Sequence, residues 1–299
     1  MPTMQKRPLL IALGLLCSIC LFFLVLVVVI SHLFQRPTHL VPRKQVGVVK
    51  VEGMILDSSN TIKQLDAFYE DDDIRAIVLR VDSPGGGVGP SQEIHDEIRR
   101  INADKPVVVS MGSVAASGGY YIAAPARRIF ANPGTLTGSI GVIMEFTNFQ
   151  ELLEKIGLSS EVVKSGKHKD IGSPVRPMTD EDRAILQALI DDVHSQFVES
   201  VAAGRKLDPQ KVRTLADGRI YTGRQARDLG LVDELGNLDA AVRYAGQLVG
   251  IEGKPEVVYP PTDKPKLIDF LVQEAASQLR QVLSKQTAGG LQYTWPGFN

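Results

Sequence analysis

Residues 9–30 form a run of 22 residues that contains no charged side chain and is rich in Leu, Val, Ile and Phe. As an α-helix, a run of this length would extend about 33 Å, close to the thickness of the hydrocarbon layer of a bilayer. The apolar part of a cleaved signal peptide is shorter, about 7–15 residues, and small residues follow it. Here Ser31 is followed by His32 and Leu33 instead. We therefore expect an uncleaved transmembrane helix over residues 9–30.

The N-terminal segment, residues 1–8, carries Lys6 and Arg7 and no acidic residue. A basic segment this short usually remains in the cytoplasm. This orientation predicts a single-pass protein of the plasma (inner) membrane whose main body is extracytoplasmic, in the periplasm. Three basic residues after the apolar run oppose it, namely Arg36, Arg43 and Lys44.

Charged residues and cysteines are unevenly distributed along the chain. The first 51 residues hold six Lys or Arg and no acid, whereas the remaining chain holds 27 basic and 34 acidic residues. An acidic body argues against a nucleic-acid partner, which would require a basic face. Cys17 and Cys20 both lie in the apolar run. The body therefore has no disulfide and no cysteine-ligated zinc site.

Apolar segments with strand character alternate with helical patterns after residue 45. Strands are expected at 46–51, 76–81, 106–111, 129–130 and 141–144, and helices at 60–70, at 91–101 and from a capping box that begins at Thr179. This alternation predicts an α/β domain with a largely parallel sheet. We place a linker at 31–45, the α/β domain at 46–245, and a C-terminal extension at 246–299 with an amphipathic helix and a loose tail.

A glycine-rich segment, residues 82–89, follows a predicted strand and precedes a predicted helix. A dinucleotide loop of the form G-x-G-x-x-G is excluded, because Pro90 or Gln92 occupies the place of its last glycine. A P-loop is excluded because no Lys-Ser/Thr pair ends the segment. Glycines allow close approach of a ligand to the backbone. The segment is therefore an oxyanion hole, an edge for a substrate strand, or merely a tight turn.

Ser117 lies where another predicted strand, within residues 106–111, leads towards a helix of small residues. Its neighbours are Ala116 and Gly118, so a substrate can reach the hydroxyl. The Gly118 amide would point to a developing oxyanion at the positive end of the helix. The pattern is close to the G-x-S-x-G motif of serine hydrolases, with Ala115 in place of the first glycine. The alternative is a serine that only caps the helix.

A nucleophilic serine requires a base, and residues 164–170 offer two kinds. His168 would complete a triad with an aspartate. Lys164, Lys167 or Lys169 would form a Ser–Lys dyad, provided that burial lowers the lysine pKa from about 10.4 towards 7. The spacing does not decide between the triad and the dyad.

Several motifs together resemble the signal peptide peptidase A family in its short, single-repeat form. They lie in order along residues 45–245, at 83–87, 111–121, 135–142, 164–170, 217–226 and 231–236. The resemblance implies a Clp protease/crotonase-like fold with repeated ββα units. It also implies a serine endopeptidase that cleaves signal peptides left in the membrane after secretion.

The resemblance assigns roles to five residues. Ser117 matches the nucleophile, Lys169 the general base, and Ser139 a serine that hydrogen-bonds the lysine. Gly86 and Gly118 match the amides of the oxyanion hole. The family requires no metal or organic cofactor, and short forms assemble as homo-oligomeric rings whose sites are shared between neighbouring subunits.

Three alternative functions are compatible with these motifs. A related Ser–Lys membrane protease would act on another membrane protein and would differ only in its substrate. A crotonase-like acyl-CoA enzyme would use the glycine-lined oxyanion hole without Ser117 chemistry. A non-enzymatic membrane scaffold would keep the fold and lack turnover.

Overall fold

The computed structural model describes residues 15–16, 18–27, 44–261 and 292–294. The chain divides into two units, Met1–Arg43 and Lys44–Asn299, which are described separately. In the first unit, residues 15–16 and 18–27 are helical, and the rest of the predicted span 9–30 lies outside the described residues. Among the described residues, no helix combines the length and the apolar character needed to cross a bilayer.

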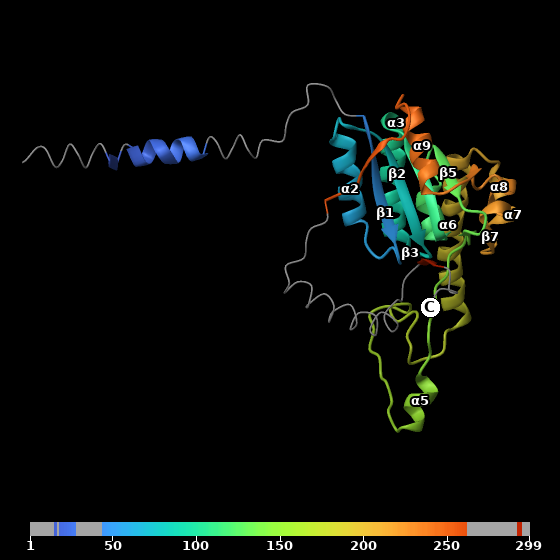
Figure 1. Ribbon diagram of the computed structural model, residues 1–299. Helices are drawn as coiled ribbons and strands as arrows, with labels where there is room; N and C mark the ends of the chain where they lie inside the picture. Colours follow the sequence, from blue (N-terminus) through green and yellow to red (C-terminus); the bar gives the residue numbers. More distant parts are fainter. Residues whose placement is uncertain (1–14, 17, 28–43, 262–291, 295–299) are drawn as a thin grey trace, which may run out of the picture. The chain divides into compact units, whose positions relative to one another are not determined.

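An eight-stranded sheet forms the centre of the described second unit (Figure 1), and its main path runs β7-β6-β4-β2-β1-β9. Its strands are β1 (Gln45–Glu52), β2 (Ile74–Ser83), β4 (Val107–Ala116), β5 (Arg128–Ala131), β6 (Leu136–Gly138), β7 (Ile220–Thr222), β8 (Glu234–Leu235) and β9 (Glu256–Val258). Strands β1, β2 and β4 pair in parallel, whereas β6 and β7 pair antiparallel. The expected mixed α/β architecture, consistent with a Clp protease-like fold, is confirmed.

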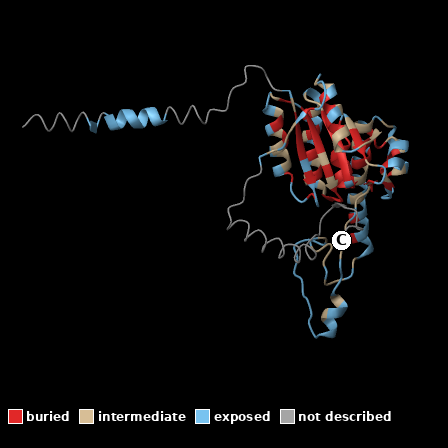
Figure 2. Cartoon of the chain, viewed as in Figure 1, coloured by how far each residue is buried: buried red, intermediate tan, exposed pale blue. Residues whose placement is uncertain are grey.

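Helices cover both faces of this sheet. The helices of this unit are α2 (Ser59–Glu70), α3 (Val88–Asp104), α4 (Gly118–Ala123), α5 (Gln150–Lys155), α6 (Asp180–Arg205), α7 (Pro209–Leu215), α8 (Gly223–Leu229) and α9 (Leu238–Leu248), of which α5 lies away from the sheet (Figure 1). One apolar core joins the sheet to residues of α2, α3, α4 and α6, and a second core joins the opposite face to α9. The central strands are therefore buried on both faces (Figure 2), which explains their continuous runs of Val and Ile.

The strand expected at residues 141–144 is wrong. These residues form no strand of the sheet, and the short strand β6 (Leu136–Gly138) lies just before them. The apolar side chains there had indicated a strand, but Gly138 and Ser139 both have positive φ angles, of 79° and 48°. Two consecutive residues in this conformation turn the chain out of the sheet, so the strand ends at Gly138.

The expected loose C-terminal tail contains a strand. Residues Gln292–Thr294 form β10, which pairs antiparallel with the glycine-rich strand β3 (Gly85–Gly87). Backbone pairing is invisible in the apolar pattern of a sequence, so composition gave no sign of it. The amphipathic helix expected after Pro265 lies outside the described residues.

Residues 143–178, named the arm below, leave the sheet after β6 and return at the start of α6 (Figure 1). The arm contains the short helix α5 and otherwise consists of turns and irregular chain. Helix α6 begins with the predicted capping box: the Asp182 N–H donates to the Thr179 hydroxyl, and the Thr179 N–H donates to the Asp182 carboxylate. The arm is thus joined to the longest described helix at a well-defined end.

Candidate active site

Ser117 lies at the junction between β4 and α4, with φ 55° and ψ −118°. A serine in this region of backbone space is strained by about 1–3 kcal/mol, and such strain is concentrated at functional sites. Its side chain makes no capping hydrogen bond to α4. The hydroxyl is buried, contrary to the expected access of a substrate, and it has no hydrogen-bond partner among the described residues. This geometry argues against the helix-capping interpretation and resembles the turn that presents a nucleophile.

The surrounding backbone holds Ser117 in its strained conformation. The Ser117 N–H donates to the Gly138 carbonyl at 2.8 Å, and the Tyr120 and Tyr121 N–H groups donate to the Ser117 carbonyl. Tyr120 is completely buried, and its hydroxyl donates to the Leu231 carbonyl at 2.8 Å. Burial raises the pKa of Tyr120, so it remains a neutral donor that fixes α4.

The two predicted oxyanion glycines lie close together. A Cβ atom added to Gly118 would be 3.1 Å from the Gly86 nitrogen and 3.2 Å from the Gly85 Cα. The Gly87 N–H donates to the Ile55 carbonyl at 2.8 Å, and the Ile55 N–H donates to the Gly85 carbonyl. Because successive residues of a strand turn their amides to opposite edges, the Gly86 N–H points away from Ile55. It therefore points to the edge of β3 that β10 occupies, and the Gly86 nitrogen lies close to Gly118.

One edge of β3 pairs with an extended segment of the same chain. Strand β10 pairs there in antiparallel register, with Tyr293 opposite Gly86 and Thr294 opposite Gly85. Addition of a strand to a sheet edge is a general mode of peptide recognition. Of the interpretations left open for the glycine-rich segment, the substrate edge therefore has a direct structural parallel within this chain.

A backbone hydrogen bond brings Ser139 close to Ser117. It follows Gly138, whose carbonyl accepts the Ser117 N–H, and it is buried with 5% of its surface exposed. Its N–H donates to the Arg219 carbonyl at 2.8 Å, which holds its positive φ of 48°. The structure thus places Ser139 beside the Ser117 junction.

The described structure does not pair Ser117 with either predicted base. Lys169 lies exposed in the arm, and no hydrogen bond joins it to Ser117. The His168 ring instead faces α6, with its Nε2 atom 3.4 Å from the Glu181 carboxylate and its Nδ1 atom 3.9 Å from the Asp182 carboxylate. Four of the five predicted residues therefore gather around one junction, and the predicted general base, Lys169, lies apart from them.

Two residues near the site were missed from the sequence. Ile55 forms the bridge that holds β3, and the Ser91 hydroxyl donates to the Gly87 carbonyl at 2.8 Å. Gly53, with φ 73°, marks the turn before Ile55 and was the available signal. Within the described residues, no group of three or more His, Cys, Asp or Glu side chains is arranged to hold a metal ion.

Comparisons with known proteins agree on a peptidase family. The model of peptidase family S49 matches residues 99–252, and the Clp protease model matches residues 48–135. A Synechocystis sp. protein named as a protease is 47% identical over 212 residues, covering 70% of this chain and 76% of that protein.

Two further relatives are longer than their matched part. An Enterococcus faecium protein named as signal peptide peptidase SppA is 39% identical, over 67% of this chain and 62% of its own length. Protease 4 of Salmonella typhi is 36% identical, over 80% of this chain and 40% of its own length. The chain thus spans less than two thirds of each of these two relatives.

Proposed function

The chain belongs to peptidase family S49, and from this premise we propose that it is a membrane-anchored serine endopeptidase with a Ser117–Lys169 dyad. The predicted resemblance to the signal peptide peptidase A family is confirmed by the family model and by the named relatives. The single observation that carries the catalytic proposal is the strained, uncapped Ser117 with two glycine amides beside it.

The proposed reaction is acyl transfer. Neutral Lys169 takes the Ser117 proton, and the alkoxide attacks the carbonyl carbon of a peptide bond. The Gly86 and Gly118 amides stabilise the oxyanion, and protonated Lys169 then gives its proton to the leaving amine. Water, with Lys169 again as base, hydrolyses the ester and regenerates Ser117. The Ser139 hydroxyl would orient the lysine.

A ring of identical subunits would supply the missing base from a neighbouring chain. The exposed position of Lys169 in the arm supports this arrangement, because its own chain leaves the Ser117 hydroxyl without a partner among the described residues. The arm also exposes large apolar side chains, namely Ile143, Phe149, Leu152, Ile156, Leu158, Val162 and Val163. Apolar surface of this kind is typical of a protein interface.

Signal peptides remaining in the membrane are the proposed substrates. The edge of β3 supports a peptide substrate, since it already pairs with an extended backbone. The apolar run of residues 9–30 supports an anchor with a cytoplasmic N-terminus, which would hold the peptidase unit beside the bilayer. The name signal peptide peptidase SppA of the Enterococcus relative supports the same substrate class.

The test compares Lys169→Ala with His168→Ala and Ser117→Ala in the full chain, purified in a mild detergent. Hydrolysis of an apolar fluorogenic peptide is measured against pH. We expect Ser117→Ala and Lys169→Ala to lose nearly all turnover and His168→Ala to keep most of it. Loss of turnover in His168→Ala alone would replace the dyad with a triad. A folded, assembled wild-type chain that cleaves neither this peptide nor a synthetic signal peptide would contradict the proposal.

A further inference from the structure

Lys169 is held by neither a helix nor a strand. Its N–H donates to the Gly166 carbonyl at 3.2 Å, and the next turn joins the Ile171 N–H to the His168 carbonyl at 3.1 Å. Such short turns have little stability of their own. The position of the Lys169 backbone therefore depends on contacts that join these turns to a larger element.

The next residue, Asp170, makes the strongest of these contacts. Arg176 binds its carboxylate with two nitrogens, Nε to Oδ2 at 2.9 Å and Nη2 to Oδ1 at 3.1 Å, and Nη2 also donates to the Asp170 carbonyl. Lys164 Nζ lies 2.5 Å from Oδ1. A two-pronged Arg–carboxylate pair fixes orientation as well as distance. The Arg176 guanidinium holds the pKa of Asp170 well below its usual value.

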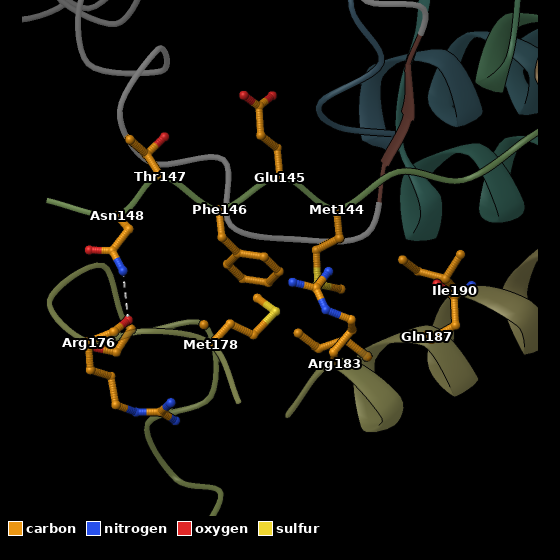
Figure 3. A pocket seen from close by; sticks show the side chains of 13 residues that line it. Met144, Glu145, Phe146, Thr147, Asn148, Arg176, Met178, Arg183, Gln187 and Ile190 are labelled. Atoms are coloured by element: carbon orange, nitrogen blue, oxygen red, sulfur yellow. Dashed lines mark hydrogen bonds between the residues drawn. The ribbon is translucent and has the colours of Figure 1, made fainter. Parts of the chain in front are cut away.

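Arg176 also reaches the first turn of α6. Its Nη1 atom lies 2.6 Å from Oδ2 of Asp182, whose side chain is 4% exposed and belongs to the capping box. The same arginine is held from its backbone side, because the Asn148 amide donates to the Arg176 carbonyl at 3.0 Å (Figure 3). One side chain thus joins the residue after Lys169 to the N-terminus of the longest described helix.

The chain just after these turns is closely packed. Gly172 has φ 77°, and a Cβ atom there would be 2.4 Å from the Phe146 ring. Phe146 and Met178 point into a pocket of about 470 Å³ that Arg176 and Arg183 also line (Figure 3). The chain that follows the Lys169 turns therefore packs against the start of the arm and lies beside α6.

We propose that Arg176 is a positioning residue for the peptidase reaction, which holds Lys169 through Asp170 and fixes it to α6. This inference rests on the proposed function, since the position of Lys169 matters only if Lys169 is the base. Arg176 would hold Lys169 in the same way if Lys169 served a neighbouring subunit, because Arg176, Asp170 and Lys169 belong to the same arm. A displacement of about 1 Å in a catalytic group costs on the order of 100-fold in rate.

The first measurement is the steady-state hydrolysis of the fluorogenic peptide by the full chain. We expect Arg176→Ala to lower kcat about 100-fold and to leave KM within about twofold, because the peptide edge at β3 is untouched. Arg176→Lys should retain an intermediate kcat, since an ammonium group cannot reproduce the two-pronged contact. Arg183→Ala is the matched control: Arg183 lines the same pocket, is exposed, and makes no hydrogen bond to Asp170.

The second measurement is the coupling between Arg176 and Asp170. If Arg176 acts through Asp170, the double variant Arg176→Ala/Asp170→Ala should be no slower than the slower single variant. Two losses that multiply would mean separate effects and would overturn the proposal. Thermal unfolding of each variant identifies a loss of kcat that comes from a damaged fold, and an Arg176→Lys variant that melts like wild type keeps the test valid.

Lys169→Ala, measured in parallel, separates the two hypotheses. If Lys169→Ala is inactive while Arg176→Ala and Asp170→Ala keep kcat within twofold, the positioning role is wrong and the proposed dyad stands. If Lys169→Ala turns over like wild type, the dyad is wrong, and the positioning role falls with it. A low kcat in Lys169→Ala and in Arg176→Ala, with an unchanged KM in Arg176→Ala and a coupled double variant, supports both the dyad and the positioning role.

Discussion

Substitutions of Ser117 can separate the loss of its hydroxyl from the relief of its backbone strain. Ser117→Gly and Ser117→Ala both remove the hydroxyl, but only glycine relieves the positive φ of 55°. After the extra chain entropy of glycine is counted, we expect Ser117→Gly to be about 1 kcal/mol more stable than Ser117→Ala, or about 2–4 °C in Tm. Calorimetry on the two variants measures the difference. Equal melting temperatures would show that the strain is no larger than the entropy cost of glycine.

A single Cβ atom added at Gly118 would disturb the candidate site. A Cβ atom there would lie 2.7 Å from the Ser91 hydroxyl as well as 3.1 Å from the Gly86 nitrogen. Gly118→Ala should therefore separate the two proposed oxyanion donors and lower kcat by about 100-fold. Ser91→Ala alone should change kcat little, and the double variant should recover part of the lost stability by removing the closest contact. A fully active Gly118→Ala variant would contradict this arrangement of donors.

Residue identity alone predicted part of this site. The local sequence predicted the position of Ser117 and Gly118, because small residues surround them at a strand-to-helix junction. Arg176 carried no such signal, since its role comes from side chains brought together by the return of the arm to α6. Ile55 was equally hidden, because its contribution to the site is a backbone bridge that any residue type can make.

The start of α6 makes the arm sensitive to acid. The Arg176 guanidinium holds the pKa of Asp182 well below its ordinary value. A carboxyl group with a lowered folded-state pKa stabilises the fold fully above its unfolded pKa of about 3.9, and this contribution is lost as the pH falls towards the folded-state value. Between pH 6 and pH 3, the free energy of unfolding of wild type should fall more than that of Asp182→Asn.

Urea unfolding at pH 6, 4 and 3, followed by circular dichroism, measures this difference. Asp180→Asn is the matched control, because Asp180 lies in the same turn of α6 but is exposed. An equal acid dependence in wild type and in Asp182→Asn would show that the Arg176 contact contributes no pH-dependent stability.

Strand β10 makes a second prediction at the scale of elements. Because β10 occupies the edge of β3 opposite Gly86, it should compete with a short peptide for that edge. Deletion of residues 292–299 should lower KM for the fluorogenic peptide and leave kcat unchanged. Deletion of residues 295–299 keeps β10 and is the control. A KM that is equal in both deletions would contradict competition at β3.

Elements with a strong apolar period were predictable, and those that depend on pairing were not. Runs of Val and Ile predicted the strands β1, β2 and β4. One apolar face predicted the helices α2, α3 and α6. Strands β3 and β10 contain too few apolar residues to be recognised from the sequence. They form through backbone pairing with other parts of the chain, which an apolar pattern does not show.

At the scale of the whole molecule, the proposed nucleophile and the proposed base lie apart. The sheet and α4 present Ser117, whereas Lys169 lies exposed in the arm. A sequence cannot show whether two motifs meet within one chain or between chains, because both arrangements use the same residues. If the two residues meet between subunits of a ring, mixed assemblies should recover a predictable fraction of the activity.

Ser117→Ala and Lys169→Ala chains are each expected to be inactive, and a mixture of the two distinguishes the arrangements. After the two chains are unfolded together in equal amounts and refolded, a shared site is active only where an intact Ser117 meets an intact Lys169 from the neighbouring chain. Random assembly then places both at about a quarter of the sites, so about a quarter of wild-type kcat per chain should return. A dyad within one chain would give no activity at any ratio. Wild type taken through the same refolding is the control, and analytical ultracentrifugation reports whether the mixed chains assemble.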